Sequence, residues 1–244
     1  MTAHLFFLSE AEKLVVGSET RVVGSEFKHA KVRRIDINEQ ILLADRSGNK
    51  YLAIVKDLNK DALTCEILEV LQAELPNPEI IIIQALAKNG RDEQAIESCT
   101  EVGAHTFIPW QANRTIVKWD TKKQKKMLQK WENVVTAAAK QARRAYVPKV
   151  TSLHTTKQLI QTLKDTKIYV LHEDATESLA KVIKHNDEPI KKIAFIIGPE
   201  GGITHEELKQ FSKLDGLIVS VSNHVLRSSN AAVVALAQFQ VLQD

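Results

Sequence analysis

The chain has 244 residues, of which 44% are hydrophobic and 26% charged, and its formal net charge is +3. These proportions are ordinary for a folded globular protein, and the length suits one large domain or two smaller ones. The first residues show no features of a secretory signal, and no segment has the unbroken apolar length of a membrane span. We therefore expect a cytoplasmic protein without membrane insertion.

Two features of the composition indicate which metals and binding partners to expect. Cys65 and Cys99 have no neighbour at the spacing of a metal site or redox motif, so we expect reduced structural residues without zinc or a disulfide. Residues 114–149 contain 11 lysines and arginines but only two acidic residues, Asp120 and Glu132. This local asymmetry indicates a polyanionic partner.

The first 70 residues predict a compact β-barrel. Short strands are expected at 5–8, 20–23, 40–44, 51–58 and 63–70, with a hairpin turn at 45–49. Pro76 and Pro78 then interrupt the pattern, because proline continues neither a helix nor a central strand. We predict a domain at 1–72, a linker at 73–79 and a second domain at 80–244.

The second domain alternates apolar strands with amphipathic helices, which is typical of an α/β fold with a parallel sheet. Strands are expected at 80–86, 106–109, 167–171, 192–197 and 217–221, and helices at 93–102, 121–144, 176–184, 205–212 and 230–242. The last two strands are apolar at consecutive positions, as in strands buried on both faces. We therefore predict that they occupy the centre of the sheet.

Residues 195–207 form the most informative segment, a buried strand followed by Gly198-Pro199-Glu200-Gly201-Gly202 and a helix start. Thr204 and Glu207 have the spacing of a capping box, and the glycines allow backbone groups to approach a ligand. The segment lacks the lysine of a P-loop and the glycine spacing of a dinucleotide site, so ATP and NAD are poor candidates. A strand-to-helix turn without a ligand is the alternative.

A second segment, residues 219–232, contains a polar bend, Val225-Leu226-Arg227-Ser228, before the final helix. A loop ending in a helix cap at Ser229 or Asn230 is the simple interpretation. The two segments together, however, resemble the SPOUT superfamily, specifically the ribosomal RNA small subunit methyltransferase E family. Further segments resembling family blocks are 84–88, 100–104, 108–109, 113–118, 139–148 and 171–173, with His29 and Val32-Arg33-Arg34 in the first domain.

The resemblance implies a PUA-like β-barrel followed by a SPOUT methyltransferase domain whose end forms a trefoil knot. It also implies S-adenosylmethionine as cofactor and methylation of N3 of a decoding-region uridine in 16S ribosomal RNA. A homodimer is implied as well, with the apolar helix 230–242 as its interface; the alternative is that this helix packs within one subunit. By carry-over, the cofactor-binding residues are Leu171, Glu173, Ile197, Gly198, Gly202, Val221, Val225 and Leu226.

Methylation of a ring nitrogen depends mainly on positioning and charge stabilisation. We expect Arg227 to act on the reacting base or a phosphate, and Arg114 to be the second catalytic candidate because it follows a strand end. Asn230 or Ser229 would orient the base. A salt bridge is the alternative for Arg227, and a helix cap for Asn230. The chain departs from the family in having Val221-Ser222 for Leu-Gly and Arg227-Ser228-Ser229-Asn230 for Arg-Thr-Glu-Thr.

Two basic clusters are predicted to contact RNA phosphates, as a clamp formed by both domains. They are Lys31, Arg33 and Arg34, and Lys140, Arg143 and Arg144. A solvated helix face is the simple interpretation of such residues. Two other functions stay open: methylation of another RNA by a SPOUT enzyme, and noncatalytic RNA binding in ribosome assembly, for which Ser222, Ser229 and Asn230 leave room.

Overall fold

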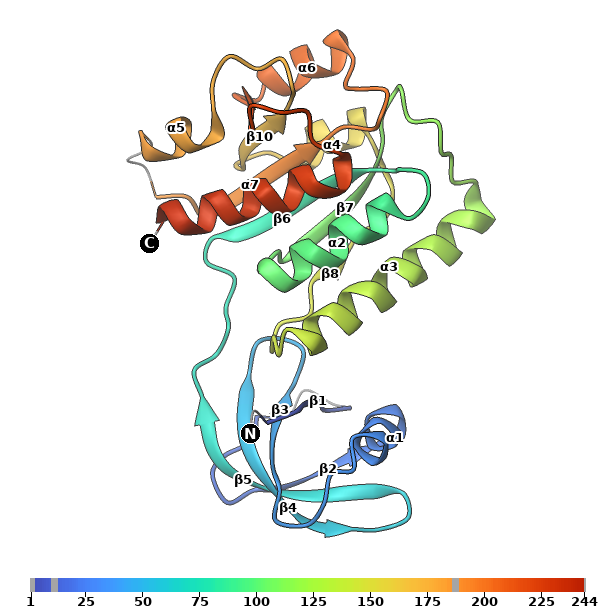
Figure 1. The fold of residues 1–244 in the computed structure, drawn as a ribbon, viewed down its shortest axis with the longest axis vertical. Coiled ribbons are helices and arrows are strands. Elements are labelled where there is room, and N and C mark those ends of the chain that lie inside the picture. The colour runs from blue at the N-terminus through green and yellow to red at the C-terminus, as the bar shows by residue number, and fades with distance from the viewer. Residues whose placement is uncertain (1–2, 10–12, 186–188, 244) are drawn as a thin grey trace. The chain divides into compact units, whose positions relative to one another are not determined.

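The computed structural model describes residues 3–9, 13–185 and 189–243 (Figure 1). Its contacts divide the chain into two compact units. The first comprises Met1–Leu75 and Ala139–Val147, and the second comprises Pro76–Ala138 and Pro148–Asp244. The units therefore differ from the predicted domains in one respect, because a segment from the middle of the chain groups with the N-terminal unit.

The first unit contains a five-stranded sheet in the order β1-β3-β4-β5-β2. The strands are β1 (Leu5–Phe7), β2 (Glu19–Val23), β3 (Gln40–Ala44), β4 (Lys50–Leu58) and β5 (Ala62–Leu71). All pairings are antiparallel except the parallel pair β1 and β3. The five predicted strands are confirmed to within one residue at each end. Because β1 does not pair with β2 among the described residues, the ladder is not closed into a full barrel.

The turn between β3 and β4 is organised by Asp45. Its carboxylate accepts hydrogen bonds from the backbone N–H groups of Ser47 and Asn49 at 2.8 and 3.0 Å, and from both side chains at 2.6 Å. Such side-chain acceptors stabilise tight turns by replacing backbone hydrogen bonds. The predicted turn at 45–49 is confirmed, and it fixes the register of the two strands.

Helix α1 (Gly24–Val32) was not predicted. It buries only Phe27 and Ala30, and its N-cap residue, Val23, provides no side-chain hydrogen bond. A short helix with two buried positions and no capping signal lacks the periodicity that identifies a helix in a sequence.

The segment Ala139–Val147 completes the core of the first unit. Ala139 and Ala145 pack in one buried cluster with Leu5, Phe7 and Ala44. Polar contacts add to this packing, since the backbone N–H of Ala145 donates to Glu74 Oε2 at 2.9 Å and Lys140 Nζ lies 2.6 Å from Glu26 Oε2.

The second unit has a parallel sheet in the order β12-β10-β11-β6-β7-β8, with β9 also paired to β7 (Figure 1). Its strands are β6 (Glu79–Ala85), β7 (Thr106–Gln111), β8 (Lys149–Val150), β9 (His154–Thr155), β10 (Lys167–Leu171), β11 (Lys192–Ile197) and β12 (Leu217–Val219). Its helices are α2 (Arg91–Val102), α3 (Thr121–Gln141, with its last residues in the first unit), α4 (Thr156–Thr162), α5 (Leu179–Lys184), α6 (His205–Ser212) and α7 (Ser228–Gln243). The predicted α/β class is confirmed.

Helices cover both faces of this sheet. Leu159 of α4 and Phe211 of α6 pack on one face with Ile83 and Ile196. On the other face, α2 and α7 lie side by side, and Phe239 of α7 meets the ring of Phe195 at a centroid distance of 6.0 Å (Figure 1). Among the described residues, no helix is both long and apolar enough to cross a membrane.

Only one of the last two strands occupies the sheet centre. β11 lies between β10 and β6, but β12 is an edge strand whose first residue, Leu217, is 37% exposed. The prediction is therefore wrong for β12, because an apolar run does not distinguish an edge strand from a central one. β12 also ends at Val219 rather than residue 221, since Ser220 forms an isolated bridge with Ser178.

The predicted helices agree in position, with differences at their ends. α3 ends at Gln141 rather than 144 because Arg143 adopts a left-handed φ of 54°. α5 begins at Leu179 rather than 176, since Ser220 accepts a hydrogen bond from the N–H of Leu179 and donates its own N–H to Glu177. The short elements β8, β9 and α4 were not predicted.

Candidate functional site

A cavity of about 260 Å³ opens at the carboxyl ends of β10, β11 and β12. In parallel α/β sheets, ligands bind at this edge. The structure brings all the residues of the predicted cofactor set to this cavity: Leu171, Glu173, Ile197, Gly198, Gly202, Val221, Val225 and Leu226. Three segments distant in sequence thus form one site.

The glycine turn after β11 forms one wall. A side chain at Gly198 would place its Cβ 2.6 Å from Ile203 Cγ1, so a larger residue would force the Ile203 side chain to shift. Gly202 has a left-handed φ of 75°, and its N–H donates to the carbonyl of Pro199 at 2.8 Å. The predicted capping box is confirmed, with Thr204 as N-cap of α6 and Glu207 as its reciprocal partner.

The bend between β12 and α7 forms the opposite wall. The hydroxyl of Ser222 accepts a hydrogen bond from the N–H of His224 at 3.0 Å. The serine hydroxyl therefore contributes to the turn. Val225 lines the cavity and is 80% exposed, so its apolar side chain is available for contact with a ligand.

The three predicted catalytic residues occupy different places. Arg227 lines the cavity and is exposed, with no ion-pair partner among the described residues. Arg114 lies outside the cavity wall, but its Nη1 donates to the carbonyl of Gly201 at 3.3 Å. Asn230 is exposed in the first turn of α7 and does not line the cavity; its Oδ1 accepts a hydrogen bond from Ser229 Oγ at 3.2 Å.

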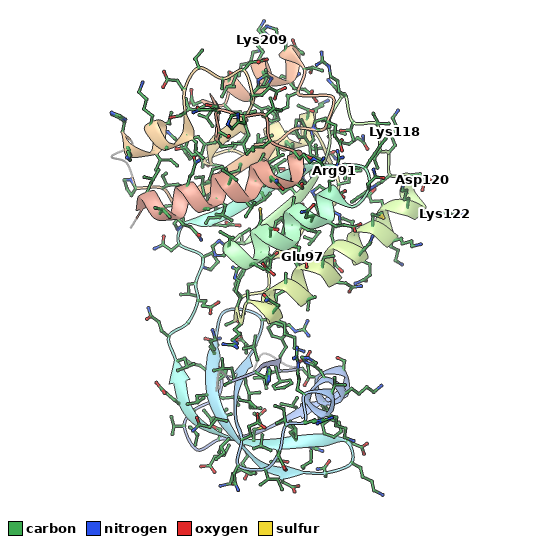
Figure 2. All side chains as sticks on the ribbon, in the orientation of Figure 1. Arg91, Glu97, Lys118, Asp120, Lys122 and Lys209 are labelled. Atoms are coloured by element: carbon green, nitrogen blue, oxygen red, sulfur yellow. The ribbon has the colours of Figure 1, made fainter. Side chains whose placement is uncertain are left out.

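Arg91 also lines the cavity, and the sequence analysis missed it. Its Nη1 lies 3.3 Å from Glu200 Oε1, and both side chains are 33% exposed. Figure 2 shows Arg91 at the start of α2. The available signal was its position directly after the turn that follows β6, at the same edge of the sheet as the glycine turn.

Glu207 connects three segments beneath the site. It is fully buried, and its Oε1 accepts hydrogen bonds from the N–H of Asn113 and the hydroxyl of Thr156, each at 2.9 Å. Its Oε2 accepts from the N–H and the hydroxyl of Thr204 at 3.0 and 2.7 Å. With four donors, both oxygens of this buried carboxylate are satisfied inside the protein.

Both predicted RNA-binding clusters belong to the first unit. Lys31 Nζ lies 4.4 Å from the centroid of the Phe27 ring, and Arg33 Nε lies 3.3 Å from His29 Nε2; Arg34 is exposed. Since the second cluster does not lie in the second unit, the idea of a clamp with one predicted cluster on each domain is wrong.

Within the second cluster the side chains differ in exposure. Lys140 is 18% exposed and paired with Glu26. Arg143 and Arg144 are both half-buried. Burial lowers the pKa of Arg144, and the nearby carboxylate of Glu74 opposes that effect.

Several ionisable groups have shifted pKa values. Burial lowers the pKa of His29, and the positive charges of Lys140 and Arg33 lower it further. Burial also raises the pKa of Asp92, a buried residue in the first turn of α2. The thiol of Cys65 has its pKa raised to about 12 by burial, and burial raises that of Cys99 as well.

Comparison with known proteins defines the class. Residues 73–240 match the family described as RNA methyltransferase domain, and residues 24–68 match that described as RNA methyltransferase PUA domain. Fold and site are thus those of an RNA methyltransferase with a PUA-like N-terminal unit.

Individual relatives narrow the class to one family. The ribosomal RNA small subunit methyltransferase E of Mycobacterium bovis is 35% identical over 99% of this chain and 93% of its own. The protein of the same name from Bacillus subtilis is 30% identical over 88% of this chain and 87% of its own. A crystal structure of the Neisseria gonorrhoeae protein of that name, bound to S-adenosyl methionine, matches with a TM-score of 0.86 and 26% identity over 99% of this chain and 98% of its own. The chain belongs to the ribosomal RNA small subunit methyltransferase E family.

Proposed function

We propose that the protein uses S-adenosylmethionine to methylate N3 of a decoding-region uridine in 16S ribosomal RNA. The observation that carries the proposal is the cavity between the glycine turn and the Arg227 bend, in a chain of this family. The relatives are named for a small-subunit ribosomal RNA, which favours this substrate over another RNA.

The residues of the cavity suit the cofactor. Leu171, Ile197 and Leu226 offer apolar surface for an adenine ring, and the glycine turn offers backbone groups for polar contacts. Glu173 is exposed at the cavity with no ion-pair partner among the described residues, so its carboxylate suits a cationic group. The cofactor supplies an electrophilic methyl group for transfer to the uridine nitrogen.

The chain's own residues then position the base and stabilise charge. N3 gives up its proton to solvent water as it takes the methyl group, and negative charge develops on the neighbouring uridine oxygens. The guanidinium of Arg227, which has no carboxylate partner in the part of the chain that the structure describes, stabilises that charge. Arg114 acts as a positioning residue through its hydrogen bond to Gly201, and Asn230 orients the base from the first turn of α7.

RNA contacts of the first unit follow from exposure. Lys31, Arg33 and Arg34 lie on or directly after α1 and are exposed, so they bind phosphates directly, and the half-buried Arg143 adds a further cation. Lys140 and Arg144 contribute less directly, because Lys140 is paired with Glu26 and Arg144 is half-buried near Glu74.

The assembly and setting belong to the same proposal. We infer a cytoplasmic homodimer, a trefoil knot at the C-terminal end of the second unit and a target within the small ribosomal subunit. α7 already buries Ala232, Ala235 and Phe239 within the chain, so a dimer interface on this helix uses its other side, where Val241 is 74% exposed.

The test uses purified protein, labelled S-adenosylmethionine and small ribosomal subunits from cells that lack the endogenous enzyme. We expect label on N3 of one 16S uridine. Binding of cofactor and RNA without transfer to any RNA would instead support the noncatalytic alternative. Transfer to a different RNA would assign another substrate.

A further inference from the structure

The second unit, which carries the cofactor cavity, contains a further cavity with no assigned role. It measures about 460 Å³ and lies where the loop after β7 meets the start of α4 and one side of α6. We call it the Thr115 pocket, and its lining includes Asn113, Thr115, Lys118, Thr156, Lys157 and Glu207. Its volume falls within the range of about 300 to 1,000 Å³ that is typical of small-ligand sites.

The pocket wall contains an unsatisfied polar group. Thr115 is only 5% exposed, and its Oγ1 has no hydrogen-bond partner among the described residues. Leaving a buried hydroxyl unpaired costs about 1 to 3 kcal/mol, so natural structures rarely do so without a reason. A ligand in the pocket would supply the missing partner.

Charge is arranged in two zones. The buried part holds the carboxylate of Glu207, whose two oxygens are already occupied by four donors, and the hydroxyl of Thr156. The exposed part holds Lys118 and Lys157, neither of which has an ion-pair partner among the described residues. Figure 2 shows Lys118 projecting from the segment before α3. A neutral polar group suits the interior, and an anion suits the rim.

The pocket is also tied to the cofactor cavity through one loop. Arg114, next to Thr115, donates to the carbonyl of Gly201 at 3.3 Å, and a Cβ at Gly201 would lie 3.0 Å from the carbonyl oxygen of Arg114. Asn113, on the other side of Arg114, is held by Glu207. The loop between β7 and α3 therefore contacts the glycine turn and lines the second pocket.

We propose that the Thr115 pocket binds a nucleotide that flanks the methylated one in single-stranded RNA. The base enters the polar interior and meets the Thr115 hydroxyl, while Lys118 and Lys157 contact the phosphates on either side. This inference rests on the proposed RNA methylation and adds a second contact next to the cofactor cavity, so that the strand is held at two points.

The first test compares the double variant Lys118→Gln/Lys157→Gln with Lys164→Gln/Lys213→Gln. The control pair loses the same charge at a different cavity, beside the first residues of β10 and β11. The probe is a single-stranded RNA oligonucleotide that carries the target uridine. Its affinity is measured at salt concentrations from about 50 to about 200 mM, a range over which phosphate contacts change affinity strongly. We expect the slope of log affinity against log salt to fall by about 1.4 for the first pair only, since each phosphate contact contributes about 0.7.

The second test uses Thr115→Val, which removes the hydroxyl while keeping the shape. A structural role for this hydroxyl predicts lower stability, whereas a ligand-binding role predicts unchanged or higher stability with RNA affinity lower by roughly tenfold. S-adenosylmethionine affinity should stay within about twofold in all variants. Equal salt slopes for the two lysine pairs, together with unchanged RNA affinity in Thr115→Val, would overturn the inference while leaving methylation itself intact. If the unmodified protein does not methylate the RNA, the proposed function itself would be refuted.

Discussion

The carboxylate of Glu207 accepts a hydrogen bond from the backbone N–H of Asn113 at 2.9 Å, although the two residues are 94 positions apart. Glu207 is the reciprocal partner in the capping box of α6. Through its bond to Asn113 it also holds the loop that carries Arg114. One side chain thus links the N-terminus of α6, which follows the glycine turn, to the loop that contacts that turn.

Replacing Glu207 by alanine should lower the free energy of unfolding by about 3 kcal/mol, because several buried donors lose their acceptor at once. Glu207→Gln should cost less, since it keeps one acceptor oxygen. Urea denaturation measures both, with Glu206→Ala as control because Glu206 is an exposed neighbour on the same helix. If Glu207→Ala lowers the free energy of unfolding by less than about 1 kcal/mol, the result would contradict this role.

Gly198→Ala should weaken S-adenosylmethionine binding by on the order of tenfold or more, because the added Cβ would lie 2.6 Å from Ile203 Cγ1 and displace the cavity wall. Isothermal titration calorimetry provides the affinity. Gly17→Ala serves as control: Gly17 has a left-handed φ but no atom within 4 Å of a Cβ, so stability falls while cofactor affinity does not. Equal affinities in the two variants would argue against a tight turn at Gly198.

Arg227→Gln should reduce kcat by about 100-fold, the size of effect typical of removing one group that stabilises charge in a transition state. Cofactor affinity should change little, since the guanidinium is assigned to the base rather than to S-adenosylmethionine. Arg227→Lys should recover part of the rate, because it keeps the charge but loses the planar fork. Single-turnover methylation separates the chemical step from binding; an equal loss in cofactor affinity would assign Arg227 to the cofactor instead.

The hairpin turn at Asp45 should make stability depend on acidic pH. Burial raises the pKa of this carboxyl, but the hydrogen bonds from Ser47 and Asn49 outweigh burial and hold the pKa below the ordinary 3.8. The folded state therefore favours the ionised form, and its contribution is present above about pH 4 and lost as the pH falls through the folded-state pKa.

Asp45→Asn should remove that contribution. The difference in stability between the parent and Asp45→Asn should be largest near neutral pH and shrink below pH 4, as thermal unfolding over a pH series would show. Asp57→Asn, at an exposed position late in β4, provides the matched control. A stability difference that does not vary with pH would contradict the assignment.

Cys65 and Cys99 should not react with thiol reagents in the folded protein. Both side chains are buried, and burial raises the pKa of Cys65 to about 12, so the reactive thiolate is scarce. We expect two thiols to react in denaturant and none under native conditions, as measured with a chromogenic disulfide reagent. Rapid reaction of either thiol in the native protein would show that its segment opens.

Much of the fold follows from local patterns. Strands such as β11 and β6 were predictable because their apolar runs are long and bounded by turn residues, and the capping box at Thr204 marked the start of α6. The edge position of β12 was not predictable, because the order in which strands pair depends on contacts between distant segments. α1 and α4 are too short for a clear helical period.

The functional site, too, was only partly predictable from the sequence. The residues of the cofactor cavity could be named because two motifs carry a family resemblance, and their positions in the structure surround one cavity. Arg91 and the Thr115 pocket could not be predicted from the sequence, since they depend on which side chains from separate elements meet. The pairing of Lys140 with Glu26 was equally hidden, because a basic residue on a helix gives no sign of a carboxylate 114 positions away.

The segment Ala139–Val147 has a consequence for how the chain folds during synthesis. The apolar cluster of Leu5, Phe7 and Ala44 is covered by Ala139 and Ala145, which leave the ribosome long after β5. The N-terminal unit therefore stays incomplete as a nascent chain until Val147 has emerged, by which time about two fifths of the second unit, Pro76–Ala138, has also emerged. Ordinary domain-by-domain folding does not apply here, and a fragment that stops at Leu75 would display an apolar patch prone to aggregation.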